Sequence, residues 1–122
     1  MNQPGAIPSV DVLEANRRLE GNERALVVDV REPNEFSVVR LPGSALFPLS
    51  TFALRHGDIP RDRPILVLCA AGSRSLAATA HLLRSGWTDI VNVAGGIDAW
   101  QRAGLPTRSG PIDPGEGDLP SG

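Results

Sequence analysis

The single cysteine of this chain, Cys69, stands where a nucleophile could be held and activated. It follows an apolar run, residues 64–68, and precedes a helical pattern, residues 76–84, with small residues between them. In such a loop several backbone N–H groups can converge on one point, and the helix N-terminus adds partial positive charge there. A thiol at that point has a lowered pKa. The pattern predicts a nucleophilic cysteine in an anion-binding loop, residues 69–75. The alternative is a small buried apolar residue at a strand end.

Composition limits the chemistry that the rest of the chain can add. The length of 122 residues predicts one domain, and a net charge of −2 gives no reason to expect nucleic acid or a membrane as partner. All twelve basic residues are arginines, so a Schiff-base lysine is excluded. A single cysteine excludes an intramolecular disulfide and a dithiol mechanism. With no signal-like leader and no long apolar run, we expect a cytoplasmic protein, a setting that suits a free catalytic thiol.

Short apolar runs alternate with helical patterns, which is typical of an α/β fold with a mainly parallel sheet. Strands are predicted at residues 25–30, 44–47, 65–68 and 89–93. Helices are predicted at residues 10–20 with Ser9 as N-cap, and at residues 33–36, 48–56, 75–84 and 97–102. The ligand site of such a sheet lies beyond the carboxyl ends of the strands. Cys69 and residues 29–31 both occupy such ends, which supports a site there.

The two ends of the chain differ from its middle. Residues 1–5 are expected to be a flexible leader. Residues 107–122 contain four glycines and three prolines, but only one isoleucine and one leucine. A segment of this kind buries too little apolar surface to order itself, so a disordered tail is predicted. The folded domain is therefore expected to span residues 6–106.

Several stretches, taken in order, resemble the signatures of the rhodanese-like domain. They are VVDVREPNEF (residues 27–36), LPGSA (41–45), CAAGSRS (69–75), NVAGGIDAW (92–100) and AGLP (103–106). Each piece alone is weak, but the ordered set is highly specific and covers almost all of the predicted domain. The resemblance implies a three-layer fold with a mainly parallel central sheet of about five strands and helices on both faces.

The resemblance also implies a sulfurtransferase whose Cys69 carries a persulfide. In that chemistry a thiolate attacks a sulfur–sulfur bond, and the exposed persulfide is then attacked in turn. The donor is expected to be a small anion such as thiosulfate, or a protein persulfide, and the acceptor a thiol or cyanide. No cofactor or metal is expected, and no metal role for His56 or His81. The loop residues expected around the substrate are Ala70, Ala71, Gly72, Ser73, Arg74 and Ser75.

The polar residues of the loop have two interpretations each. Arg74 could bind an anionic donor or pair with an acidic neighbour, and the sequence favours neither. Ser73 and Ser75 could donate hydrogen bonds to the bound anion or could cap the following helix. We favour the cap, because serine is a common residue at helix N-termini.

Two further residues, Asp29 and Arg31, are expected to support the site. By resemblance Asp29 lies beside the loop, where it could orient the loop or accept hydrogen bonds from its own turn. Arg31 could pair with Glu35 on the surface or flank the mouth of the pocket. The sequence leaves both choices open.

Two positions depart from the family's pattern. Many active members carry a basic residue directly after the cysteine, where this chain has Ala70. A histidine is common before the I-P-G turn, where Arg40 precedes Leu41 here. The pocket is therefore expected to hold less positive charge, which argues against thiosulfate as physiological donor and leaves the persulfide chemistry intact.

Two other functions compete with sulfur transfer. Cysteine phosphatases that share this fold use a C-x5-R loop, whereas Cys69 and Arg74 form a C-x4-R loop, one residue shorter. A shorter cradle suits a single sulfur better than a phosphoryl group. The other alternative is a non-catalytic binding or regulatory module, against which the presence of Cys69 argues. The sequence predicts no oligomeric state.

Overall fold

The structure is a computed structural model, and it describes residues 6–121. Within that range the central sheet has five strands in the order β1-β6-β5-β2-β4, and all neighbouring strands are parallel. The strands are β1 (Ser9–Val10), β2 (Leu26–Asp29), β4 (Ala45–Leu46), β5 (Ile65–Leu68) and β6 (Ile90–Val93). The predicted α/β architecture, with a parallel sheet of about five strands, is confirmed.

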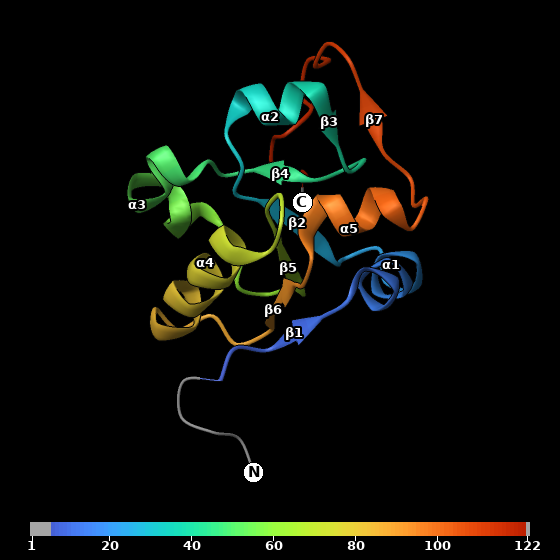
Figure 1. Ribbon diagram of the computed structural model, residues 1–122. Helices are drawn as coiled ribbons and strands as arrows, with labels where there is room; N and C mark the ends of the chain where they lie inside the picture. Colours follow the sequence, from blue (N-terminus) through green and yellow to red (C-terminus); the bar gives the residue numbers. More distant parts are fainter. Residues whose placement is uncertain (1–5, 122) are drawn as a thin grey trace.

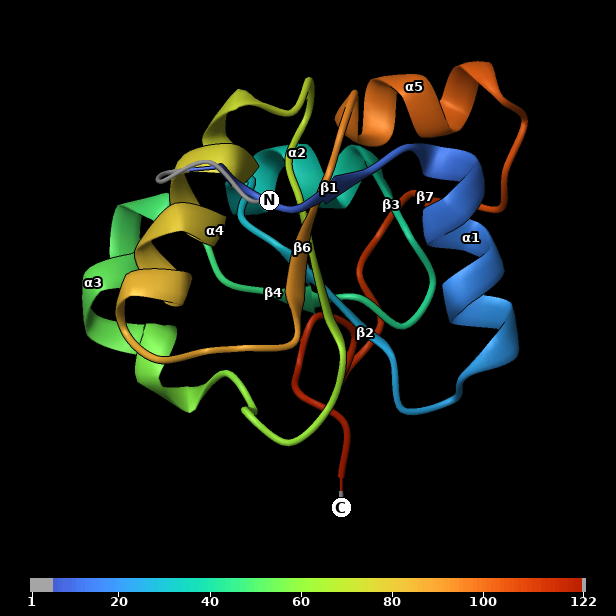
Figure 2. The same ribbon diagram turned by 90° about the horizontal axis from the view of Figure 1, so that it is seen from below.

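Helices cover both faces of this sheet (Figure 1). They are α1 (Val12–Gly21), α2 (Pro33–Val38), α3 (Phe52–Arg55), α4 (Ser73–Arg84) and α5 (Gly96–Arg102). Figure 2 shows α3 and α4 on one side of the strands and α1 and α5 on the other. Alternate strand residues point to opposite faces, so Val28 and Val67 pack with the α3–α4 side while Val27 and Leu66 pack with the α1–α5 side. Both faces are buried, which explains the continuous apolar runs.

Helix α1 begins later than its sequence pattern predicts. Its N-cap is Asp11, whose carboxylate accepts a hydrogen bond from the Glu14 N–H at 2.8 Å. Ser9 instead belongs to β1, which pairs with β6 at the edge of the sheet. Serine and aspartate are comparable N-caps. The pairing of β1 with β6 decides between them, because it holds Val10 as well as Ser9 in the strand and so prevents the helix from starting at Val10.

Two short strands lie outside the central sheet. Strand β3 (Val39–Arg40) pairs antiparallel with β7 (Arg108–Ser109), which lies beside it in Figure 1. The segment between β4 and β5 contains α3 and two turns of 3₁₀ helix, Leu49–Thr51 and His56–Asp58. The structure has these three short helical elements where the sequence predicts one helix over residues 48–56.

Residues 107–121 pack against the domain, whereas composition predicts a disordered tail. Besides the β3–β7 pairing, the Gly117 carbonyl accepts a hydrogen bond of 2.7 Å from the Leu46 N–H of strand β4. The guanidinium of Arg40, a residue only 1% exposed, donates to Glu116 and to backbone carbonyls of this segment. Leu119 packs against the core, but most of the contacts that hold the segment are hydrogen bonds, including those to a buried charge, and composition does not measure their contribution.

The leader expected at residues 1–5 lies outside the described residues. Helix α4, with twelve residues, is the longest helix between residues 6 and 121. A bilayer-spanning helix needs about 20 apolar residues. No helix in this range is long and apolar enough to cross a membrane.

Candidate active site

Cys69 directly follows β5, and the chain then turns into helix α4. The turn is made at Gly72, which is the N-cap of α4 and has a φ of 107°. Residues with a side chain rarely adopt that conformation. A Cβ at this position would also lie 3.1 Å from the backbone nitrogen of Gly95. The loop therefore has the strand–turn–helix arrangement that the sequence predicts, with the N-terminus of a twelve-residue helix beside the Cys69 side chain.

The Cys69 sulfur is surrounded by hydrogen-bond donors. The Gly72 N–H donates to Sγ at 3.0 Å, and the Ser75 hydroxyl oxygen lies 3.2 Å from it. Burial raises the pKa of the thiol, but hydrogen bonds from the Ser75 hydroxyl and from the N–H groups of Ser75, Gly72 and Ala71 together lower the pKa below its ordinary value. A cysteine that only filled apolar space would gain nothing from these donors. The arrangement can hold a thiolate.

Ser75 contacts the sulfur directly and does not cap helix α4, contrary to the role that we favoured from the sequence. It is completely buried, and its single hydroxyl hydrogen has more than one acceptor within reach, among them the Asn92 side-chain oxygen at 2.6 Å and the Cys69 sulfur at 3.2 Å. Asn92 lies on β6 and was missed by the sequence analysis. The signal for it was a polar residue inside an otherwise apolar strand, residues 90–93. Asn92 fixes the position of the hydroxyl that faces Cys69.

The loop is fixed from its other side by the start of helix α5. The Ile97 N–H donates to the Cys69 carbonyl at 2.9 Å, and the Asp98 N–H donates to the Ala70 carbonyl at 3.0 Å. The chain approaches closely here because Gly96 has no side chain, and a Cβ on it would overlap both of those carbonyl oxygens. With the two carbonyls turned toward α5, the N–H groups of the loop are free to face the sulfur.

Arg74 pairs with an acidic neighbour, Glu35 of helix α2. Two guanidinium nitrogens donate to the two carboxylate oxygens at 2.7 and 2.8 Å. The hydrogen bonds from Arg74 lower the pKa of Glu35 to about 2, and the same pair raises the pKa of Arg74. The sequence left open whether this arginine binds a donor or an acid. In the structure it forms a bidentate ion pair, partly exposed to solvent.

Asp29 and Arg31 pair with one another at the carboxyl end of β2, which lies beside the end of β5. Their side chains are nearly completely buried, and the guanidinium contacts both carboxylate oxygens, the shortest distance being 2.7 Å. Arg31 also donates to the carbonyl of Val39 at 2.8 Å. It therefore neither pairs with the Glu35 carboxylate on the surface nor lines an open pocket mouth, as the sequence suggested. Asp29 additionally accepts a hydrogen bond of 3.0 Å from the Arg31 N–H, the local turn contact considered from the sequence.

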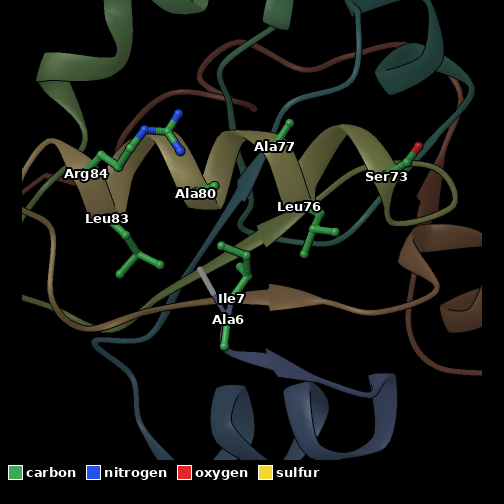
Figure 3. A pocket seen from close by; sticks show the side chains of 8 residues that line it. All are labelled: Ala6, Ile7, Ser73, Leu76, Ala77, Ala80, Leu83 and Arg84. Carbon is green, nitrogen blue, oxygen red and sulfur yellow. The ribbon is translucent and has the colours of Figure 1, made fainter. Parts of the chain in front are cut away.

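Cys69 itself is only 1% exposed, and the residues that follow it in the loop are small. Ala71 and Ser73 are exposed and Ala70 is partly exposed. Beside the loop, an apolar groove of about 740 Å³ runs along helix α4 from Ser73 to Arg84. Figure 3 shows side chains of α4 pointing toward Ile7 across this groove. Cys69 does not line it, so the groove is a neighbour of the thiol site and not the site itself.

The two histidines of the chain lie together between helices α3 and α4. The rings of His56 and His81 meet edge to face with centroids 4.8 Å apart, next to Phe52 and Trp87. The sequence did not predict this pairing. Between residues 6 and 121, no group of three or more His, Cys, Asp or Glu side chains could hold a metal ion.

Residues 11–103 match the family model of the rhodanese-like domain. That span is most of the chain and includes the Cys69 loop, both ion pairs beside it and the β6 residue that contacts Ser75. The chain belongs to the rhodanese-like domain family, as its sequence signatures predicted.

Known proteins and structures support this assignment over nearly the whole domain. A sulfurtransferase of Allochromatium vinosum is 35% identical over 100 residues, which cover 82% of this chain and 94% of that protein. A rhodanese-related protein from Thermoplasma volcanium superposes with a TM-score of 0.74 at 31% identity, covering 83% of this chain and 97% of the other. A thiosulfate sulfurtransferase from Pseudomonas aeruginosa gives a TM-score of 0.76 at 26% identity, covering 85% of this chain and 20% of that protein.

Proposed function

We propose that this protein is a rhodanese-type sulfurtransferase in which Cys69 carries the transferred sulfur as a persulfide. One observation carries the proposal: the Cys69 sulfur lies within hydrogen-bond distance of the Gly72 N–H and the Ser75 hydroxyl. These donors increase the thiolate fraction, and the thiolate is the species that attacks a sulfur–sulfur bond. Membership of the family and the similarity to a protein named sulfurtransferase support the same function.

The reaction has two displacement steps. In the first, the Cys69 thiolate attacks the outer sulfur of a donor R–S–SH, the sulfur–sulfur bond breaks, and R–S⁻ leaves with its electron pair. With thiosulfate as donor, the leaving group is sulfite. In the second, an acceptor thiolate attacks the outer sulfur of the Cys69 persulfide and regenerates the Cys69 thiolate; with cyanide the product is thiocyanate. Each step exchanges one sulfur–sulfur bond for another bond to sulfur, so no external oxidant or reductant is required.

The chain's own residues have separate roles in this scheme. The backbone N–H groups of the loop, residues 70–75, hold the anionic sulfur, and the short side chains of Ala70 and Ala71 leave space for the donor. When Cys69 is ionised, the Ser75 hydroxyl turns its hydrogen from Asn92 to the thiolate. The Asp29–Arg31 pair fixes the end of β2, which lies beside the end of β5 where the loop begins.

The donor and acceptor classes follow from this scheme. A persulfide on a small molecule or a protein is the donor that we favour, with thiosulfate as a weaker one, and a thiol or cyanide is the acceptor. The adenylyltransferase and sulfurtransferase uba4 of Ogataea parapolymorpha is 36% identical over 100 residues, and those residues make up 25% of that larger protein. A reducing compartment such as the cytoplasm suits the free thiol of Cys69.

Intact mass after incubation with a sulfur donor tests the proposal. The unaltered protein should gain one sulfur atom, the gain should disappear in Cys69→Ser, and cyanide should remove it with formation of thiocyanate. Melting temperature and circular dichroism of Cys69→Ser should stay close to those of the unaltered chain. Sulfur transfer that persists in Cys69→Ser would refute the mechanism. Efficient hydrolysis of an aryl phosphate that depends on Cys69 would favour the phosphatase alternative instead.

A further inference from the structure

Both arginines beside the Cys69 loop are already paired with carboxylates. The guanidinium of Arg31 is buried against Asp29, and that of Arg74 is held by Glu35 through two hydrogen bonds. The residue after the cysteine, Ala70, adds no charge. The charges of these four side chains, two positive and two negative, therefore cancel one another. A thiolate at Cys69 then gives the site a net negative charge.

Glu35 is held in place independently of Arg74. Its Oε1 also accepts a hydrogen bond of 3.0 Å from the Glu32 N–H at the start of helix α2. Hydrogen bonds from Arg74 hold the pKa of Glu35 at about 2, so its carboxylate is ionised throughout the neutral range. A donor that binds Arg74 must therefore displace an ionised carboxylate that does not move away.

The Glu35–Arg74 pair lies where an incoming donor would meet it. Its side chains are 30% and 35% exposed, in contrast to the enclosed pair at the end of β2. Arg74 belongs to the first turn of helix α4, whose N-cap, Gly72, donates to the Cys69 sulfur. The pair thus combines access from solvent with proximity to the reacting thiol.

We propose that Glu35 determines the donor specificity of this site by keeping Arg74 neutralised, so that Cys69 is loaded from persulfides of low charge in preference to dianionic thiosulfate. The inference rests on the sulfurtransferase function proposed above and names its substrate class. Glu35 acts through Arg74 and is a positioning residue.

The physical reason is the charge of the donor. Thiosulfate brings two negative charges toward a thiolate, and its outer oxygens need a cation with free N–H groups. Two of the five N–H groups of the Arg74 guanidinium, one on each terminal nitrogen, are already bound to Glu35, so the remaining N–H groups belong to an ion pair with no net charge. A persulfide R–S–SH with an uncharged R group needs no cation, because its leaving group gains its negative charge only as the bond breaks.

The test compares loading of Cys69 from thiosulfate and from 2-hydroxyethyl persulfide, followed by intact mass over time. Glu35→Gln removes the carboxylate charge and keeps a similar shape. We expect it to raise the ratio of the thiosulfate to the persulfide loading rate about tenfold, the effect of one ion pair made available to the donor. Glu14→Gln is the matched control, because Glu14 pairs with Arg17 and Arg18 on α1 and should leave the ratio unchanged. An unchanged or lowered ratio in Glu35→Gln overturns the inference.

The salt dependence of the thiosulfate loading rate in the unaltered protein is a second measurement. It does not require any variant to fold. Because Arg31 and Arg74, the arginines beside the loop in the described part of the chain, are both paired, added potassium chloride should screen the repulsion between thiosulfate and the thiolate, and the loading rate should rise. A loading rate that falls with salt means that a cation already serves the donor, and the inference fails while the sulfurtransferase function stands. Failure of both donors to load Cys69 refutes the sulfurtransferase function itself, and the inference with it.

Discussion

Arg40 and Glu116 are 76 positions apart in the chain, yet two guanidinium nitrogens of Arg40 bind the two carboxylate oxygens of Glu116 at 2.8 and 2.7 Å. The same guanidinium donates to the carbonyls of Gly110 and Pro111, at 2.8 and 3.1 Å. Arg40 is buried, so these are the contacts that compensate its charge. The C-terminal segment is thereby an integral part of the fold.

Truncation after Pro106 should therefore destabilise the domain, although composition alone predicts a dispensable tail. Truncation removes strand β7, which pairs with β3, and it removes the carboxylate and the two carbonyls that bind the Arg40 guanidinium. We expect the melting temperature to fall by about 5 °C or more. An unchanged melting temperature after truncation would show that the segment contributes nothing to the stability of the domain.

Acid should weaken the protein through Glu35 and Glu116. Hydrogen bonds from Arg74 and Arg40 respectively hold the pKa of each carboxyl at about 2, against an ordinary value of 4.5. Because the folded pKa values are the lower ones, the unfolded chain takes up protons first as the pH falls. The stabilisation is complete above about pH 4.5 and is lost progressively toward pH 2.

Urea unfolding at a series of pH values measures this effect. The free energy of unfolding should fall on going from pH 5 to pH 3, and the slope should be smaller in Glu116→Gln, which has no carboxyl to titrate there. The matched control is Glu23→Gln, since Glu23 is exposed on the loop after α1. Equal slopes in Glu116→Gln and the unaltered chain would contradict the ion pair.

Ser75→Ala should make the Cys69 thiol less acidic. The change removes the hydroxyl 3.2 Å from the sulfur and leaves the backbone donors in place. A hydrogen bond to a charged acceptor contributes about 1.5–3 kcal/mol, so the pKa should rise by roughly one unit or more. The rate of alkylation by iodoacetamide against pH measures it. Ser37→Ala, which removes a hydroxyl bonded only within α2, should leave the profile unchanged.

Gly96→Ala should damage both stability and sulfur loading. The residue has a φ of 60°, and a Cβ would overlap the carbonyl oxygens of Cys69 and Ala70. The conformational penalty of about 1–2 kcal/mol then adds to a steric one of about 1–3 kcal/mol. Gly104→Ala is the control, with a φ of 72° and no atom within 4 Å of an added Cβ. If both variants lose the same stability, the close approach of α5 to the loop is unimportant.

The sequence by itself determined the elements that run locally along the chain. Runs such as residues 65–68 predict buried strands because their apolar residues are continuous, and small residues after Cys69 predict a tight turn into a helix. Motif order predicts the family for the same reason, since each signature is a short contiguous stretch. The position of the thiol at the carboxyl end of a strand follows directly from these local patterns.

The tertiary structure alone decided which polar side chains meet. Arg74 binds Glu35, 39 positions away. The Ser75 hydroxyl, which was expected to cap helix α4, instead contacts Asn92, 17 positions away. Any of twelve arginines could pair with any of fourteen acidic residues on charge alone. Ion pairs and hydrogen bonds depend on distances of a few ångströms, and those distances are set only when the helices and strands have packed. The local pattern therefore identifies the nucleophile, whereas the packed fold determines the charge that surrounds it.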